Sequence, residues 1–178
     1  KNHIKNITLL EPDIKLFKYL KKKFKKDNIV IKNHQIKDIQ DTFDTIVYFD
    51  VIEHIKDDLN EVKTASNRLN RNGHLIISVP AFQIFYSDFD ISVGHFKRYS
   101  KKDLKEIEKN CDLRIEKLIY YDSIGFLLLL INKFFSLKSR NLKFKIFIWN
   151  LLIPISKILD FLTFNKVGKS LLCVFKKI

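Results

Sequence analysis

Short apolar runs alternate along this chain with stretches whose apolar residues recur at helical spacing. The run at 7–10 is apolar and ends at an acid, and the residues after Asp13 carry apolar side chains every three or four positions. This second pattern predicts a helix with one buried face. Asp13 can cap it, because its carboxylate accepts hydrogen bonds from the free amides of the first turn. We expect the helix to run to about Lys26.

The alternation continues through most of the chain. Further strands are predicted at 29–31, 45–49, 74–79, 114–121 and 169–176, and further helices at 59–69 and 101–109. Asn72-Gly73 is a turn signal, which should end one helix and begin the strand that Pro80 stops. Strands that alternate with helices predict right-handed crossovers and a parallel sheet, so the expected fold class is α/β.

Residues 124–164 have a different pattern, in which apolar runs are interrupted by Asn150, Pro154, Lys157 and Asp160. No run reaches the roughly 18 apolar residues that a membrane-spanning helix needs. We therefore expect two or three helices that form a cap or a membrane-surface element. The predicted organisation is a core at 1–123, a helical insertion at 124–164 and a last core strand at 165–178.

Charge and cysteine content limit the partners and the compartment. The 178 residues carry a formal net charge of +13, mostly from lysine spread over the whole chain. Without a basic recognition helix or an aromatic-basic motif, this charge does not predict a nucleic-acid partner. Cys111 and Cys173 form no disulfide or zinc motif, which favours a reducing compartment such as the cytoplasm.

The apolar insertion is flanked by basic side chains, at Lys133, Lys138, Arg140, Lys143, Lys145 and Lys157. Such side chains can reach anionic lipid headgroups while apolar neighbours enter the interface. Reversible contact with the inner face of a membrane is therefore an expectation, and a cap buried against the sheet is the alternative.

The stretch 43–58 is the most informative for chemistry. Its strand-like run stops at Asp50, and Glu53 and His54 follow closely. Polar groups at the carboxyl ends of parallel strands lie where open α/β sheets bind ligands. Spaced at i, i+3 and i+4, these three side chains would share one helical face if the next helix began that early.

Three segments stand out by their order and spacing: Leu-Glu-Pro-Asp at 10–13, Phe-Asp-Thr-Ile-Val-Tyr-Phe-Asp-Val-Ile-Glu-His-Ile at 43–55, and Asn-Gly-His-Leu-Ile-Ile-Ser-Val-Pro at 72–80. Taken together, they resemble the class I S-adenosylmethionine-dependent methyltransferases. Within that family they are most similar to the group that includes the ubiquinone-biosynthesis O-methyltransferases. Gly-His-Phe-Lys-Arg-Tyr-Ser at 94–100 resembles a branch associated with cell-surface sugar or lipid pathways. The resemblance implies a Rossmann-like sheet and S-adenosylmethionine as cofactor.

One part of the family's pattern has no counterpart here. The glycine-rich loop that follows the family's first strand is absent, because the glycines are Gly73, Gly94, Gly125 and Gly168. The run at 7–10 then corresponds to the family's second strand. In the family's order, 3-2-1-4-5-7-6, the missing strand would lie between 7–10 and 45–49. We expect the sequence to be the carboxyl-terminal part of a longer enzyme and to be inactive alone.

The resemblance also assigns the cofactor contacts. Glu11 stands where the family has an acid that accepts hydrogen bonds from both ribose hydroxyls, although it could instead be a turn residue beside Pro12. The other assigned residues would touch the adenine (Gln35 and Ile36) or line the methionine end (Phe49, Asp50 and Val51).

His54 is the candidate general base. Asp50, Glu53 and His54 stand where the resembled group has Glu-x-x-Glu-His, with Asp in place of the first Glu. Because that motif is implicated in divalent metal binding, a metal site there is a weaker prediction. In the alternative, Glu53 stabilises a helix start and His54 packs under the cofactor.

His95, Arg98 and Tyr99 lie in the long connection 81–99 and are the candidate substrate contacts. Arg98 could clamp a carboxylate or phosphate. In the alternative it pairs with Asp88 or Asp90 inside a structural turn.

The combined interpretation is methyl transfer, preferably to oxygen, on a small or lipid-linked acceptor. One alternative is a non-catalytic module whose basic, apolar segment binds a membrane or a partner protein. Another, a nicotinamide-dependent Rossmann enzyme, explains the acid at Glu11 but not the stretch 50–54.

Overall fold

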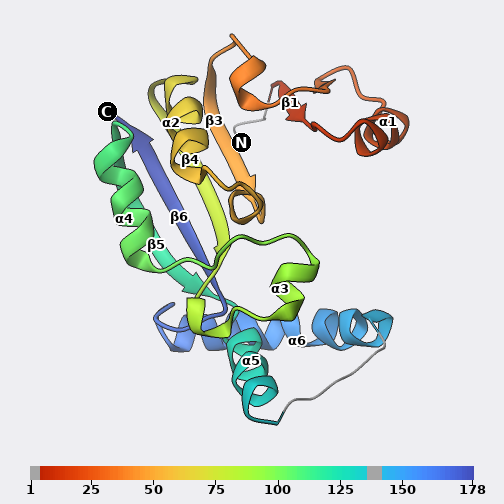
Figure 1. The fold of residues 1–178 in the computed structure, drawn as a ribbon, viewed down its shortest axis with the longest axis vertical. Coiled ribbons are helices and arrows are strands. Elements are labelled where there is room, and N and C mark those ends of the chain that lie inside the picture. The colour runs from red at the N-terminus through yellow and green to blue at the C-terminus, as the bar shows by residue number, and fades with distance from the viewer. Residues whose placement is uncertain (1–4, 136–141) are drawn as a thin grey trace. The chain divides into compact units, whose positions relative to one another are not determined.

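The computed structural model describes residues 5–135 and 142–178, and it is drawn in Figure 1. The chain divides into two compact units, of which the first ends at Thr42 and the second begins at Phe43. The predicted boundaries at 123 and 164 both lie inside the second unit, and no pattern noted in the sequence predicts the division at Thr42.

The first unit is a parallel pair of strands joined by a helix. β1 (Ile7–Leu10) pairs with β2 (Ile29–Lys32), and α1 (Ile14–Lys23) makes the crossover. Asp13 caps α1 as predicted, because its carboxylate accepts hydrogen bonds from the amides of Lys15 and Leu16 at 2.9 and 2.8 Å. The helix ends at Lys23 rather than near Lys26.

The second unit contains a four-stranded sheet in the order β3-β4-β6-β5. β3 (Phe43–Phe49) runs parallel to β4 (Leu69–Pro80), while β6 (Ser170–Lys177) runs antiparallel to both β4 and β5 (Leu113–Tyr121). Consequently β3, β4 and β5 point the same way, and their carboxyl ends meet at one edge of the sheet. This mixed sheet confirms the α/β fold class, although the sheet is not purely parallel.

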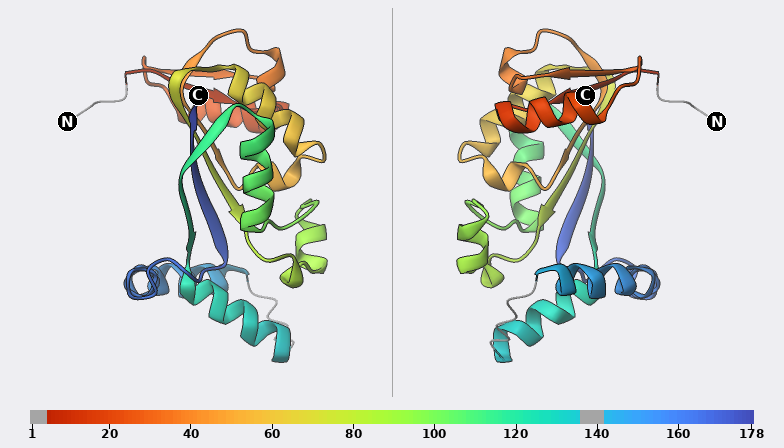
Figure 2. Two further views of the ribbon diagram at one scale, coloured as in Figure 1. Left: turned by 90° about the vertical axis from the view of Figure 1, so that its left-hand side faces the viewer. Right: turned by 90° about the vertical axis from the view of Figure 1, so that its right-hand side faces the viewer.

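Two helices cover one face of this sheet, α2 (Asp58–Asn67) and α4 (Lys101–Asn110), as Figure 2 shows. The core of the unit is built from side chains at alternate positions of the central strands. Leu75, Ile77 and Val79 of β4 and Leu171, Cys173 and Phe175 of β6 have no exposed surface. Their period of two is the pattern of a strand with one packed face.

The predicted turn at Asn72-Gly73 is a bulge inside β4. The register passes from Phe43 opposite Leu69 to Thr45 opposite His74, so the extra residues of β4 loop out of the ladder. A side chain at Gly73 would lie 2.8 Å from the carbonyl oxygen of Asn70. The glycine therefore permits a tight bulge, and the helix before it ends at Asn67.

The insertion is helical, as predicted, in the part of the chain that the structure describes. α5 (Ser123–Phe135) and α6 (Leu142–Leu162) follow the carboxyl end of β5. Of the flanking basic residues, Lys138 and Arg140 lie outside the described residues. None of the helices within 5–135 and 142–178 is both long and apolar enough to cross a membrane.

The connection from β4 to α4 contains a short helix, α3 (Asp88–Ser92), between two stretches of loop. The ends of the connection are tied together, because Ala81 and Tyr99 form a parallel β-bridge. The connection is therefore an ordered element beside the carboxyl edge of the sheet.

Candidate functional site

After β3, a left-handed residue and a 3₁₀ turn place Asp50 apart from Glu53 and His54. Asp50 has a φ of 52°, a left-handed conformation that Asp tolerates better than most residues. A 3₁₀ turn follows at Ile52–His54, and α2 begins only at Asp58. The predicted helical face shared by Asp50, Glu53 and His54 is therefore not formed.

A cavity of about 410 Å³ lies at the carboxyl edge of the sheet and is lined by Phe49, Asp50, Ser78, Tyr121 and Leu172. The Ser78 hydroxyl lies 2.7 Å from the Tyr121 hydroxyl and donates a longer hydrogen bond, of 3.5 Å, to Asp50. Burial raises the pKa of Tyr121, so its hydroxyl stays protonated.

Two of the predicted cofactor residues, Phe49 and Asp50, line this cavity, whereas Val51 does not. The sequence interpretation missed Ser78 and Tyr121. The signal that pointed to Asp50 also applies to them, because each lies near the carboxyl end of its own strand.

Glu53 is a buried carboxylate without a hydrogen-bond partner. Its exposed fraction is 1%, and neither side-chain oxygen has a partner among the described residues. Burial, assisted by the negative charge of Asp50, raises the pKa of Glu53 to about 7. Because buried polar groups are normally paired, a group of this kind is a candidate for chemistry or ligand binding.

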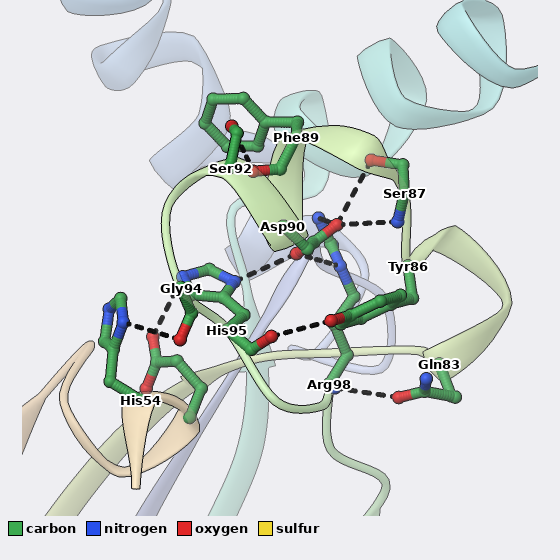
Figure 3. Close-up of polar contacts among 11 residues, drawn as sticks. His54, Gln83, Tyr86, Ser87, Phe89, Asp90, Ser92, Gly94, His95 and Arg98 are labelled. Carbon is green, nitrogen blue, oxygen red and sulfur yellow. Dashed lines mark hydrogen bonds and ion pairs between the residues drawn. The ribbon is translucent and has the colours of Figure 1, made fainter.

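His54 is exposed and has one ring nitrogen engaged. Its Nδ1 lies 3.2 Å from the carbonyl oxygen of Gly94, as Figure 3 shows. Since a carbonyl oxygen can only accept, Nδ1 must carry the proton, and Nε2 of the neutral ring keeps its lone pair. Gly94 has a φ of 84°, a conformation that suits glycine.

His95 stands between two buried carboxylates. Its Nδ1 donates to Oδ1 of Asp90 at 2.9 Å, and its Nε2 lies 3.9 Å from Oε1 of Glu53. The second distance is an ion-pair separation and too long for a hydrogen bond. The rings of His54 and His95 meet edge to face, with centroids 4.7 Å apart.

Asp90, in contrast to Glu53, is surrounded by donors (Figure 3). Arg98 donates to both of its oxygens, from Nε at 2.9 Å and from Nη2 at 3.1 Å, and the amide of Ser87 adds a third contact. Burial alone would raise the pKa of Asp90, but the hydrogen bonds from Arg98 and His95 outweigh it and hold the pKa below its ordinary value.

The predicted substrate contacts thus separate into three situations. Arg98 is buried and paired with Asp90, which is the structural alternative. Tyr99 has no exposed surface and donates to Asp58 at 2.7 Å, so it has a structural position instead of a place to meet substrate. Of the three, only the ring of His95 lies beside His54 and Glu53.

The potential metal donors also differ from the prediction. Glu53, His54 and His95 each offer an atom within 4.8 Å of the others, and Asp50 is not part of this group. One carboxylate with two imidazoles is a donor set that suits zinc or iron. Metal binding here remains a prediction, with His95 in the place of Asp50.

The predicted ribose and adenine contacts lie in the first unit. Glu11 follows β1, and one of its carboxylate oxygens accepts a hydrogen bond from the amide of Asp13 at 2.9 Å. Gln35 is exposed, whereas Ile36 is buried at the start of a short 3₁₀ turn. These positions follow the carboxyl ends of two parallel strands, as the sequence suggested.

A family model described as a methyltransferase domain matches residues 3–118. No curated protein matches the chain significantly. Solved structures match this chain in fold. One is the complex between the Haloferax volcanii Trm112 methyltransferase activator and a methyltransferase, which has a TM-score of 0.66 at 9% sequence identity. The match covers 97% of this chain and 72% of that one.

Two further structures give the same result. The N-methyltransferase NodS from Bradyrhizobium japonicum, in complex with S-adenosyl-L-homocysteine, has a TM-score of 0.57 at 12% identity and covers 98% of this chain and 68% of that one. An S-adenosylmethionine-dependent methyltransferase from Archaeoglobus fulgidus has a TM-score of 0.59 at 16% identity, covering 96% and 75%. At these identities the likeness concerns the fold.

Proposed function

Because the chain belongs to the methyltransferase domain family, we propose that its site transfers a methyl group from S-adenosylmethionine to a hydroxyl oxygen of a small or lipid-linked acceptor. The observation that carries this proposal is the contact of 3.2 Å between Nδ1 of His54 and the carbonyl oxygen of Gly94. The Gly94 carbonyl holds the proton on Nδ1, so that Nε2 is free to take a proton from an acceptor.

The residues around the cavity suit the cofactor. S-adenosylmethionine supplies, when bound, a methyl group on a positively charged sulfur. The carboxylate of Asp50 and the aromatic rings of Phe49 and Tyr121 line one cavity, and both kinds of group attract cations. We propose that this cavity holds the methionine end.

The protein's own task in such a reaction is alignment and proton removal. Methyl transfer is an in-line displacement, so the acceptor oxygen has to be held in line with the methyl group. The acceptor oxygen would gain the methyl group as the bond between the methyl carbon and the donor sulfur breaks, which leaves a neutral thioether. The bond between the oxygen and its hydrogen would break in the same step, and the proton would pass to Nε2 of His54. Such general base catalysis is typically worth about 10²–10⁴-fold in rate.

His95 is proposed to assist from beside His54. Asp90 fixes its tautomer through Nδ1, and its Nε2 faces the unpaired carboxyl group of Glu53. With a pKa of about 7, Glu53 can hold or release a proton near neutral pH. The two side chains therefore place a buried, proton-exchanging group beside the base, and His95, with 13% of its side chain exposed, is the one of the two that can reach an acceptor.

The test is methyl transfer by His54→Gln. The protein, at its full natural length, is incubated with S-adenosylmethionine and a panel of acceptors that carry hydroxyl and amino groups, and products are identified by mass spectrometry. We expect an O-methylated product and a turnover about 10²–10⁴-fold lower in the variant. His74→Gln is the matched control, because His74 is a surface residue that pairs with Glu116 at 3.2 Å. Methylation only on nitrogen, or an unaffected His54→Gln, would contradict the proposal.

A further inference from the structure

In the described part of helix α6, two polar side chains, Ser156 and Asp160, point inward. Ser156 and Asp160 are buried, with 6% and 9% of their surface exposed. The Ser156 hydroxyl donates to Asp122 at 3.0 Å, and Asp160 accepts hydrogen bonds from the amides of Asp122 and Ser123 at 2.9 and 2.8 Å. These contacts fix the helix to the end of β5 and to the first turn of α5.

The opposite face of α6 is apolar and exposed. Leu151, Ile155, Ile158 and Leu162 have exposed fractions of 64%, 49%, 60% and 61%. Their spacing of four, three and four residues places them on one side of a helix. Phe161, in the last turn of α6, and Phe164, just after the helix, are also exposed, by 77% and 80%. A surface helix normally shows the reverse arrangement, and contiguous exposed apolar surface marks an interaction site.

The charges beside the apolar stripe have one sign. Between residues 123 and 169 the sequence contains a single acid, Asp160, and that acid is buried. Lys157 lies within the described part of α6 and Lys166 follows it, and both are exposed. Among the described side chains of this segment, the exposed charges next to the stripe in sequence are therefore lysines, and an anionic surface is their complement.

We propose that α6 docks flat on an anionic lipid bilayer, with Leu151, Ile155, Ile158 and Leu162 in the interface and the lysines among the headgroups. This proposal goes beyond methyl transfer and does not depend on it. An amphipathic helix lying in the interface buries its apolar face without crossing the membrane. The inward-facing Ser156 and Asp160 keep the apolar side turned away from the sheet. Figures 1 and 2 show α6 at the end of the sheet opposite the chain's carboxyl terminus.

The test is flotation of the full chain with vesicles of phosphatidylglycerol and phosphatidylcholine, compared with vesicles of phosphatidylcholine alone. We expect binding to the anionic vesicles that weakens as salt is added, because each lysine near a charged surface is worth about a fivefold change in partitioning. Ile158→Ser should weaken the partitioning about tenfold or more, since it removes an apolar side chain from the interface. Lys157→Gln should weaken it about fivefold, and only on anionic vesicles.

The matched control is Ile178→Ser. Ile178 and Ile158 are both exposed, with exposed fractions of 74% and 60%. Ile178, however, follows β6 and is not part of α6. The control should bind vesicles like the parent protein, and circular dichroism should show all variants folded. No flotation of the parent protein would overturn the proposal. So would equal loss in both isoleucine variants, or a concentration-dependent dimer that Ile158→Ser dissolves, since a second copy would then be the occupant.

Discussion

Two neighbouring regions of the molecule each bury a carboxylate, and the two carboxylates differ in their hydrogen bonds and in the direction of their pKa shift. In α3, Asp90 is bonded by Arg98, His95 and Ser87, and its pKa is lowered. In the turn after β3, Glu53 has no hydrogen-bond partner among the described residues, and its pKa is raised to about 7. His95 lies between them.

The difference in hydrogen bonding indicates a structural role for one carboxylate and a chemical role for the other. A carboxylate that is fully paired stays ionised and fixes the surrounding chain, as a buried ion pair with satisfied lone pairs can. A carboxylate left unpaired changes its protonation near neutral pH, and such groups gather at functional sites. We infer that Asp90 holds the connection 81–99 in place, and that Glu53 is a buried group able to exchange a proton beside His95.

The largest effect is expected for Asp90→Asn. The change leaves the guanidinium of Arg98 buried without its counter-charge, and breaking a buried pair in this way costs about 3–5 kcal/mol. Urea unfolding followed by circular dichroism measures the loss. The control is Asp88→Asn, at an exposed position on the same helix, which should change the free energy of unfolding by less than about 0.5 kcal/mol. If both variants lost the same free energy of unfolding, the ion pair of Asp90 with Arg98 would not stabilise the fold.

Next in size is the pH dependence of stability due to Glu53. Its folded pKa is raised above 4.5, so the fold favours the protonated form. The stability contributed by this group is complete below pH 4.5 and is lost as the pH rises through about 7. The shift corresponds to roughly 3 kcal/mol.

Glu53→Gln should remove that dependence. We expect the variant to unfold at a higher urea concentration than the parent protein at pH 8, with the advantage gone at pH 5. Glu106→Gln, at an exposed position of α4, should leave the parent's pH profile unchanged. A profile that Glu53→Gln leaves intact would show that the pKa of Glu53 is not raised.

The smallest effect is expected for Gly94→Ala. Gly94 links the two regions, because its carbonyl oxygen contacts the ring of His54. An alanine at a φ of 84° is strained by about 1–2 kcal/mol, and it would shift the carbonyl oxygen that fixes His54. We expect a modest loss of stability together with a changed pH profile of methyl transfer. Ser92→Ala, close by in α3, loses only a hydrogen bond to Phe89 and should leave that profile unaltered. If both variants show the parent's profile, the Gly94 carbonyl does not set the tautomer.

Much of the scaffold could be predicted from local pattern. The strands, the cap at Asp13, the helical insertion and the placing of Asp50 at the carboxyl edge of the sheet all follow from periodicity and from residues near in sequence. The bulge at Asn72-Gly73 could not be read locally, because a turn signal does not distinguish a bulge from the start of a strand.

The site depended on contacts that sequence spacing does not contain. Glu53 and His95 come together because the backbone amide of Phe96 donates a hydrogen bond to the carbonyl oxygen of Glu53 at 2.8 Å. In the sequence, the whole of α2 and β4 separates these two residues. The choice of Asp90 over Asp88 as partner for Arg98 is likewise set by which side of a short helix faces the connection. The spacing of Asp50, Glu53 and His54 misled for the same reason, since it assumed a helix that begins only at Asp58.

Carbon-13 NMR titration of the side-chain carboxyl groups tests the contrast between Glu53 and Asp90 most directly. The resonances are assigned by their absence in Glu53→Gln and Asp90→Asn. We expect the Glu53 signal to titrate with a midpoint near 7, while the Asp90 signal shows an ionised carboxylate until the pH falls below 3.8. A Glu53 signal that titrates near 4.5, like an ordinary surface glutamate, would contradict the assignment of Glu53 to the chemistry of the site.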